Sequence, residues 1–335
     1  NKILVTGGLG FIGSHTVVEL QREGFDVVII DDLSNTRIEV LDGIFAISNI
    51  RPEFVQLDLK EKEQVATFFE EHNIDGVIHF AASKAVGESV EQPLKYYENN
   101  ISSLVYLLKS MSEHNVPHLI FSSSCTVYGQ ADELPITENA PIKKAESPYG
   151  NTKQIGEEII QDLTKAGNLT AIALRYFNPI GAHESALIGE LPLGVPQNLI
   201  PFVTQTAAGI REELSVFGDD YPTSDGTAVR DYIHVVDLAK AHISALQRLL
   251  NGKNKSKMEY FNVGTGKGSS VLEVINAFQK ANHKEVKYKI VDRREGDITA
   301  AYANTELANK ELGWKATLGL EEALASAWQW QLKQK

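Results

Sequence analysis

Short apolar runs alternate with longer segments of helical periodicity through the first half of this chain. Runs rich in Val, Ile, Leu and Phe predict buried strands at residues 2–6, 26–31, 53–59, 76–82, 118–124 and 170–178. The segments between them have the spacing of amphipathic helices, and we expect helices at 12–23, 61–72, 92–114 and 149–166. Strands that alternate with helices indicate βαβ units, which build a parallel sheet covered by helices on both faces.

The pattern changes after Phe177. Residues 179–228 are rich in Gly, Pro and other turn residues, which predicts loops and short elements outside the alternation. Further elements are expected as helices at 234–250, 270–281, 304–312 and 319–333 and strands at 258–266 and 285–292. We therefore expect an α/β protein, with a Rossmann-like doubly wound parallel sheet in 1–177 and a smaller mixed α/β domain in 178–335. The stretch 230–264 is expected to return to the first domain.

Composition narrows the class of protein. The chain has 335 residues, of which 43% are hydrophobic and 23% charged, as in ordinary globular proteins. Its formal net charge of −12 argues against a nucleic-acid partner. The single cysteine, Cys125, cannot form an internal disulfide, which fits a reducing compartment. We find no apolar run of membrane-spanning length and no signal-peptide layout, so we expect a cytoplasmic protein without a membrane partner.

A glycine-rich turn follows the first expected strand. The stretch VTGGLGFIGSH (5–15) contains Gly8-x-Gly10-x-x-Gly13, preceded by Gly7, and it opens a helix. Glycines at this spacing let the backbone approach a pyrophosphate, which the free N–H groups of the helix N-terminus then bind. Asp31 ends the second strand, where a carboxylate accepts hydrogen bonds from the ribose of NAD and repels the 2′-phosphate of NADP. The alternative is a structural turn that binds nothing.

Serines end one strand and precede a tyrosine–lysine pair. The strand at 118–124 ends in three serines, the last of them Ser124, and ligands of open α/β sheets bind beyond the carboxyl ends of strands. Ser147 and Pro148 suit the N-cap and first position of a helix. Tyr149 and Lys153 then lie four positions apart on one helical face. Either they form a reaction centre, or the serines are caps and the pair is an ordinary surface contact.

The order of these motifs resembles the extended short-chain dehydrogenase/reductase family. The similarity spans nearly the whole chain and is carried by the stretches TGGLGFIGSHT, DDLSN, HFAASKAVGESV, FSSSCTVYG, SPYGNTK, RYFNPIGAH, PQNLIP, FGDDYPTSDGTAVRDYIHV and RREGD. Within the family it is greatest to enzymes that invert C4 of UDP-hexoses. The resemblance implies transient oxidation at C4 with bound NAD, with Tyr149 as base and acid, Ser124 as proton relay and Lys153 favouring the phenolate.

The same resemblance assigns the binding residues. Those expected to hold NAD are Gly7, Gly10, Phe11, Ile12, Gly13, Asp31, Asp32, Asn35, Asp58, Phe80, Ala81, Lys84, Asn99, Tyr149, Lys153 and Phe177. Those expected to hold the UDP-sugar are Ser124, Tyr149, Asn178, Asn198, Leu199, Phe217, Arg230, Arg294, Asp297 and Ala301. Guanidinium groups suit phosphate oxygens, so Arg230 and Arg294 are expected to clamp the diphosphate, unless each is an ordinary surface ion pair.

Two rival activities remain at this point. Related nucleotide-sugar 4,6-dehydratases carry an Asp–Glu pair at the serine strand end, where this chain has Cys125 and Thr126, and this disfavours dehydration. The other rival is a non-catalytic NAD sensor on the same fold. Ala301 stands where some epimerases carry a tyrosine, so UDP-GlcNAc and UDP-GalNAc are expected to fit unless neighbouring Tyr302 fills the space.

Assembly and metal binding complete the expectations. In this family the helices corresponding to 92–114 and 149–166 form a four-helix contact between subunits, so the resemblance implies a homodimer. No metal site is expected. His114 and His118 have the spacing of a helical pair, but Pro117 stands between them and breaks the helix.

Overall fold

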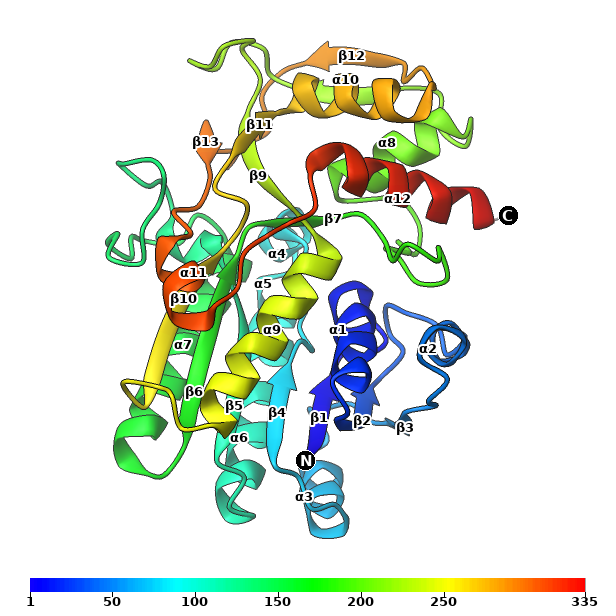
Figure 1. Ribbon diagram of the computed structural model, residues 1–335. Coiled ribbons are helices and arrows are strands. Elements are labelled where there is room, and N and C mark those ends of the chain that lie inside the picture. Colours follow the sequence, from blue (N-terminus) through cyan, green and yellow to red (C-terminus); the bar gives the residue numbers. More distant parts are fainter. Residues whose placement is uncertain (335) are drawn as a thin grey trace.

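The computed structural model describes residues 1–334 and is built on a seven-stranded parallel sheet (Figure 1). The strand order is β10-β6-β5-β4-β1-β2-β3, with every neighbouring pair parallel. The strands are β1 (Lys2–Thr6), β2 (Asp26–Asp31), β3 (Glu53–Gln56), β4 (Gly76–His79), β5 (His118–Ser124), β6 (Thr170–Tyr176) and β10 (Met258–Val263). The expected Rossmann-like α/β class is confirmed.

Helices cover both faces of this sheet, as the near-continuous apolar strands require. One face carries α1 (Phe11–Arg22), α2 (Val40–Ser48) and α9 (Val235–Leu250), and the other carries α3 (Lys62–Glu71), α6 (Ser103–Glu113) and α7 (Pro148–Ala166). Alternate residues of a strand point to opposite faces, so Ile3 and Val5 join the first core and Leu4 joins the second. Because helices bury both faces of the sheet, neither face of these strands carries a row of polar side chains.

The expected helix at 92–114 is present as continuous helical backbone over 93–113, but a π-helical turn interrupts its α-helical hydrogen bonding. The chain forms α4 (Val86–Glu91), α5 (Pro93–Tyr97), a π-helical turn η1 (Glu98–Ser102) and then α6. In the π-helical turn, Asn100 donates to the Ser83 carbonyl over 2.9 Å and accepts from its N–H over 2.8 Å. These side-chain bonds fasten the helix to the segment after β4, and π-helical turns of this kind occur often at functional sites.

The C-terminal part forms two small sheets and a third apolar core. In one sheet β9 (Val229–His234) pairs with β7 (Asn178–Ile180), β11 (Gly268–Ser270) and β13 (Ala300–Ala301), and in the other β8 (Leu214–Phe217) pairs with β12 (Tyr288–Val291). The helices are α8 (Leu199–Ala207), α10 (Val271–Asn282), α11 (Glu306–Leu312) and α12 (Leu320–Lys333). The expected strand 170–178 thus splits after Tyr176, because β6 pairs with β10 whereas β7 pairs with β9.

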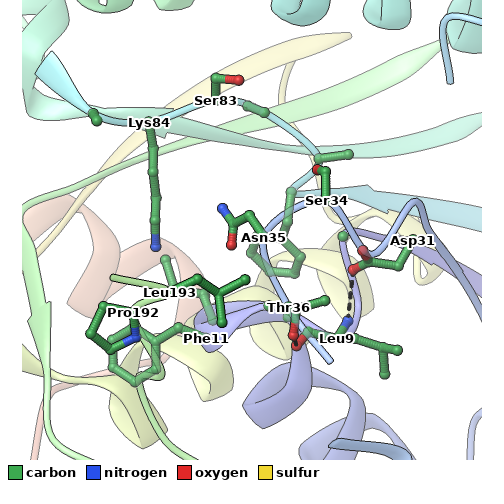
Figure 2. Close-up of a pocket in the computed structure, with 18 of the residues that line it drawn as sticks. Leu9, Phe11, Asp31, Ser34, Asn35, Thr36, Ser83, Lys84, Pro192 and Leu193 are labelled. Carbon is green, nitrogen blue, oxygen red and sulfur yellow. Dashed lines mark hydrogen bonds between the residues drawn. The ribbon is translucent and has the colours of Figure 1, made fainter. Parts of the chain in front are cut away.

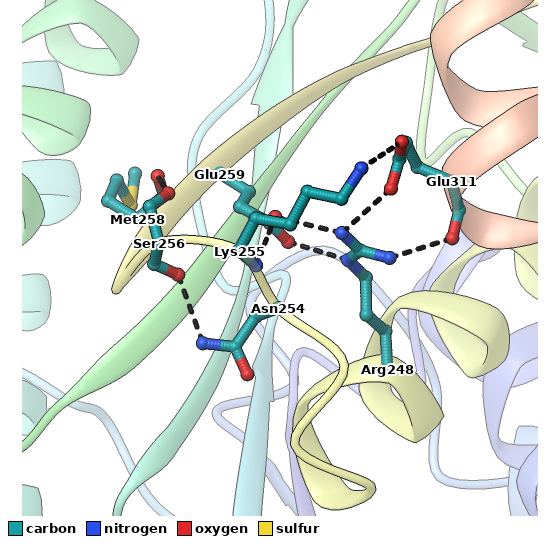
Figure 3. Close-up of polar contacts among 7 residues, drawn as sticks. All are labelled: Arg248, Asn254, Lys255, Ser256, Met258, Glu259 and Glu311. Carbon is teal, nitrogen blue, oxygen red and sulfur yellow. Dashed lines mark hydrogen bonds and ion pairs between the residues drawn. The ribbon is translucent and has the colours of Figure 1, made fainter.

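Buried charges tie the C-terminal segments to the first sheet (Figure 3). Arg248 of α9 is 6% exposed and donates to Glu259 of β10 over 2.7 and 3.0 Å. It also donates to the carbonyl and carboxylate of Glu311 in α11, over 2.8 and 3.1 Å. Trp314 enters the first core and donates to the Asp237 carbonyl over 2.9 Å. Segments after residue 230 therefore complete the first core. The division of the chain into two domains at residue 177 stays a prediction.

Residues 1–334 contain neither a helix suited to a membrane nor a cluster of side chains suited to a metal ion. No helix there combines the length and the apolar character that a membrane crossing requires. No group of three or more His, Cys, Asp or Glu side chains in the same range is placed to hold a metal ion.

Candidate active site

A cavity of about 1140 Å³ lies at the carboxyl edge of the seven-stranded sheet (Figure 2). Among the residues expected to hold NAD, those that line it are Gly7, Gly10, Phe11, Ile12, Gly13, Asp31, Asp32, Asn35, Asp58, Phe80, Ala81, Lys84, Asn99, Tyr149 and Lys153. These residues come from segments that are distant in the sequence. The parallel topology brings them together, because every strand of the sheet ends at this edge.

The glycines of this turn allow its backbone to pack closely on itself and on the segment after β4. Gly7 has a φ of +68°, and a Cβ there would lie 2.9 Å from the Ala81 nitrogen. A Cβ on Gly13 would collide with the Gly7 carbonyl oxygen and lie 2.9 Å from the Gly8 Cα. Gly10 begins α1 and no side chain caps it, so the first N–H groups of the helix are free. The turn therefore fits a pyrophosphate.

Asp31 holds the turn from the neighbouring strand. Its carboxylate accepts from the Leu9 N–H over 3.1 Å, as Figure 2 shows, and from the Leu33 N–H over 3.0 Å. The side chain is buried, which raises its pKa, and these backbone donors oppose the rise. Carboxylate oxygens have further lone pairs for a ribose hydroxyl. Asp32 differs, because its carboxylate accepts from the N–H and hydroxyl of Ser34 over 2.9 and 2.7 Å.

The tyrosine and lysine lie on one face at the start of α7. Ser147 caps this helix by accepting from the Gly150 N–H over 3.1 Å, and Pro148 is its first residue. Tyr149 is 8% exposed and Lys153 is 5% exposed. The Lys153 ammonium donates to the Ser122 carbonyl over 2.6 Å and lies 5.9 Å from the centre of the Tyr149 ring. Tyr149 and Lys153 therefore lie on one face of α7, and the activation of the phenol by the ammonium stays a prediction.

Burial shifts the pKa of both groups in the direction that favours the neutral side chain. It lowers the pKa of Lys153 to about 8, so the side chain is still charged at neutral pH. It raises the pKa of Tyr149, and Tyr176 adds to the rise, whereas a hydrogen bond with Ser124 opposes it. Ser124 is the last residue of β5, and its hydroxyl also accepts from the Thr126 N–H over 3.2 Å. These three residues, Ser124, Tyr149 and Lys153, therefore form one cluster.

Other cofactor residues take different places around the site. Asn99 lies in the π-helical turn and donates to the Ser83 hydroxyl over 3.1 Å. Asp58 follows β3, which ends earlier than expected at Gln56, and accepts from the Lys60 N–H over 2.9 Å. Phe177 is 4% exposed and belongs to a separate apolar cluster with Ala301, so its contact with a cofactor stays a prediction.

The expected substrate residues form two groups in the C-terminal sheets. Asn178 pairs with Tyr232 across β7 and β9, and Ala301 pairs with Arg230 across β13 and β9. In the second group the Arg294 guanidinium lies 5.1 Å from the centre of the Phe217 ring. It also donates to the Asp297 carboxylate over 2.9 and 3.2 Å. Neither group lines the large cavity, so their binding roles stay predictions.

The remaining expected substrate residues, Asn198 and Leu199, lie at the start of α8. Asn198, the residue before this helix, lines the large cavity, and Leu199 is the first helical residue. The Asn198 amide does not cap the helix. It donates instead to the Glu190 carboxylate over 2.6 Å.

Sequence reasoning missed part of the cavity wall. Tyr176 lines the cavity, and its hydroxyl lies 2.6 Å from that of Ser122. Its place at the end of β6, a carboxyl strand end, was the signal that would have found it. Residues 187–193 also line the cavity, in an irregular stretch without periodicity that gave no such signal.

Known proteins resemble the chain over almost its full length. The profile of a family described as GDP-mannose 4,6 dehydratase matches residues 4–327. A UDP-glucose 4-epimerase of Bacillus subtilis is 51% identical over 330 residues, which cover 98% of this chain and 96% of that protein. Another from Dictyostelium discoideum is 51% identical and covers 99% and 96%.

Solved structures agree with these sequence relatives. A UDP-glucose-4-epimerase from Stenotrophomonas maltophila, with bound NAD and formylated UDP-arabinopyranose, superimposes with a TM-score of 0.96 at 48% identity, covering 99% and 98% of the chains. One from Bifidobacterium longum, in complex with NAD+ and UDP, gives 0.95 at 48% identity with the same coverage.

Proposed function

Because this chain belongs to the UDP-glucose 4-epimerases of the extended short-chain dehydrogenase/reductase family, we propose that it interconverts UDP-glucose and UDP-galactose. The observation that carries the proposal is the cluster of Tyr149, Lys153 and Ser124 beside the glycine-rich cavity. A non-catalytic sensor would need the cavity alone. Dehydration would need an acid pair where Cys125 and Thr126 stand.

NAD is the cofactor that the cavity fits. The glycine-rich turn and the start of α1 suit its pyrophosphate, and Asp31 suits the adenosine ribose. Lys84 and Asn99 line the same cavity near Tyr149 and Lys153. Bound NAD supplies a nicotinamide ring that takes a hydride from the sugar carbon and returns it.

The residues of this chain manage the proton. The phenol oxygen of Tyr149 takes the proton of the sugar 4-hydroxyl and returns it after the sugar has rotated in the site. Ser124 relays this proton between the two oxygens. Burial alone makes this phenol a poor base. The Lys153 ammonium is assigned the opposing role, because a nearby positive charge favours the phenolate. Its bond to the Ser122 carbonyl fixes that charge in place.

The substrate diphosphate is assigned to the C-terminal groups. Arg230 and Arg294 supply guanidinium forks, which match phosphate oxygens, and Phe217 supplies a flat apolar face for uracil. Arg294 is 56% exposed and pairs with Asp297 within its own loop. An exposed pair of this kind is weak, so the guanidinium exchanges readily between Asp297 and a phosphate.

Tyr149→Phe tests the proposed base. Removing the hydroxyl should lower kcat for UDP-galactose by roughly 10²–10⁴-fold, the usual share of general acid–base catalysis. The bound NAD, measured after denaturation, should stay at the wild-type amount because the ring remains. Tyr288→Phe is the matched control, since Tyr288 is exposed on β12 and far from the cluster in sequence. Wild-type turnover in Tyr149→Phe would remove the tyrosine from the mechanism.

A second substrate class, the UDP-N-acetylhexosamines, is favoured by the surroundings of Ala301. Its side chain is only a methyl group, and the ring of Tyr302 lies against Gly268, where an added Cβ would be 2.9 Å from it. Tyr302 follows β13 and its ring is directed toward β11, so we expect it to leave the position beside Ala301 open. We expect turnover of UDP-GlcNAc, and its selective loss in Ala301→Tyr. Turnover of UDP-glucose without any of UDP-GlcNAc in the wild type would contradict this.

The assembly proposed is a homodimer through α5, α6 and α7. Leu94 is 81% exposed on α5 and Val105 is 41% exposed on α6, both unusually accessible for large apolar side chains. A second copy of this chain would cover them. Sedimentation of the wild type should give a dimer, and Leu94→Glu should shift it toward monomer. A monomeric wild type at micromolar concentration would overturn the proposal.

A further inference from the structure

The irregular segment between β7 and α8, residues 185–198, which we term the strap, forms part of the cavity wall. Figure 2 shows Pro192 and Leu193 of the strap, with Lys84 extending toward them. Two bonds from α12 hold the strap. Trp330 donates to the Glu190 carbonyl over 2.8 Å, and Lys333 donates to the Ser185 carbonyl over 2.9 Å.

Packing fixes the strap at the same point. A Cβ on Gly189 would lie 2.5 Å from the Trp330 ring, so the indole fits directly against a glycine backbone. With its carbonyl bound and the preceding residue packed, the main chain of Glu190 is fixed. The bond from Asn198 then fixes the direction of the Glu190 carboxylate at the cavity wall.

The Glu190 carboxylate is unusual in this place. It lines a cavity that is built to receive phosphates, where a negative charge opposes ligand binding. Burial raises its pKa, while the charge of Lys84 and the bond from Asn198 oppose the rise. Its one hydrogen bond to a side chain, among the described residues, is accepted from the Asn198 amide over 2.6 Å.

Asn198 stands at the beginning of α8 without capping it. The first N–H groups of a helix have no partner within it, so those of Leu199 and Ile200 are available to an anion. Pro201 contributes no N–H. An Asn amide carries two hydrogens, and Glu190 takes only one of them.

We propose that Glu190 is a positioning residue for the substrate diphosphate: it holds one hydrogen of the Asn198 amide and thereby directs the other, beside the free N–H groups of α8, toward the phosphate oxygens. The inference deepens the proposed function and rests on it. Glu190 does not touch the reacting sugar carbon in this scheme. It raises the affinity for the diphosphate by orienting Asn198. Trp330 of α12 in turn holds the main chain of Glu190 in place.

Binding of UDP to the NAD-loaded enzyme tests the inference by calorimetry, which needs no turnover. Glu190→Ala should raise the Kd for UDP about tenfold, and the KM for UDP-glucose in parallel, with kcat within about twofold of wild type. Glu190→Gln should stay within about twofold in all three, because its amide oxygen still accepts from Asn198. Glu184→Ala, at an exposed glutamate one residue before the strap, is the matched control and should change nothing.

A double-mutant cycle separates positioning from a general structural effect. If Glu190 acts through Asn198, adding Glu190→Ala to Asn198→Ala should weaken UDP binding no further. Additive losses, or a Glu190→Gln variant as weak as Glu190→Ala, would overturn the inference. A wild-type enzyme that does not bind UDP would sink the proposed function itself. If the wild type binds UDP tightly and Glu190→Ala binds it equally well, only the proposed role of Glu190 is contradicted.

Discussion

The two halves of the molecule hold their ligand residues by different means. In the cofactor half, a backbone turn and the ends of one parallel sheet make a single cavity, and its key side chains, Asp31, Tyr149 and Lys153, are less than a tenth exposed. In the substrate half, the expected residues lie on short strands and connecting loops. Phe217 is 40% exposed there and Arg294 56%.

The difference separates stability from affinity. A site made of packed backbone and buried side chains cannot be changed without straining the core around it. A site made of exposed side chains on loops can lose a contact while the fold stays intact. Perturbations of the cofactor half should therefore alter stability and ligand binding together, whereas those of the substrate half should alter binding alone.

Acid should act most strongly, and through the cofactor half. Burial lowers the pKa of three histidines there, His15 and His79 to about 3 and His242 to about 4. The unfolded chain binds these protons below about pH 6.5 but the folded chain does not, so stability is full above that pH and falls as the pH drops toward 4. Each histidine should contribute a loss of roughly 1.4 kcal/mol per pH unit in that window.

Urea unfolding at pH 7, 6 and 5, followed by tryptophan fluorescence, measures this effect. His242→Gln should make the stability less dependent on pH, because one buried imidazole is gone. His283→Gln, at an exposed histidine after α10, should leave the dependence as it was. Equal stability at pH 7 and pH 5 would contradict the prediction.

Gly13→Ala should come next in size. The added Cβ would meet the backbone of Gly7 and Gly8, which cannot move without opening the turn. Overpacking of this kind costs about 1–3 kcal/mol, and the distorted turn should also lose NAD. Thermal unfolding and the NAD released on denaturation are the measurements. Gly167→Ala is the control, because a Cβ there meets nothing closer than the Leu163 carbonyl at 3.6 Å. A Gly13→Ala variant with wild-type NAD content would contradict the expectation that stability and cofactor binding change together in this half.

Arg294→Ala should have the smallest effect on the fold. The side chain is exposed, its ion pair lies within its own loop and its contact with the Phe217 ring is also exposed, so the free energy of unfolding should change by less than about 0.5 kcal/mol. The KM for UDP-glucose should rise about tenfold through loss of a charge-assisted contact, with NAD content unchanged. Loss of NAD or a large drop in stability would show that the two halves are not separable in this way. An unchanged KM would remove Arg294 from the substrate site.

The cofactor half was predictable from sequence because its signals are local. The glycine spacing, the acidic strand end at Asp31 and the Ser147–Pro148 helix start each depend on a few neighbouring residues, and the fold class they imply is confirmed. The expectation of NAD agrees with the solved neighbours.

The remainder depends on contacts between distant segments. Nothing in the sequence of 92–114 indicates that Asn100 will bind Ser83 or that the helix will contain a π-helical turn. The strap has no period, and it becomes a cavity wall only because α12 packs against Gly189. Binding residues of the substrate half, like the cytoplasmic location, stay predictions, since they rest on resemblance or on composition.

The Arg248 network and the late strand β10 also bear on how the protein is made. The apolar face of α1 packs against α9, and residues of β10 and Trp314 belong to the same core; all of these leave the ribosome long after the glycine-rich turn. A nascent chain that has reached residue 177 therefore still exposes much of its first core. Such chains are prone to aggregation and need shielding by chaperones. The glycine-rich turn is therefore synthesised well before the segments that complete the core beneath it.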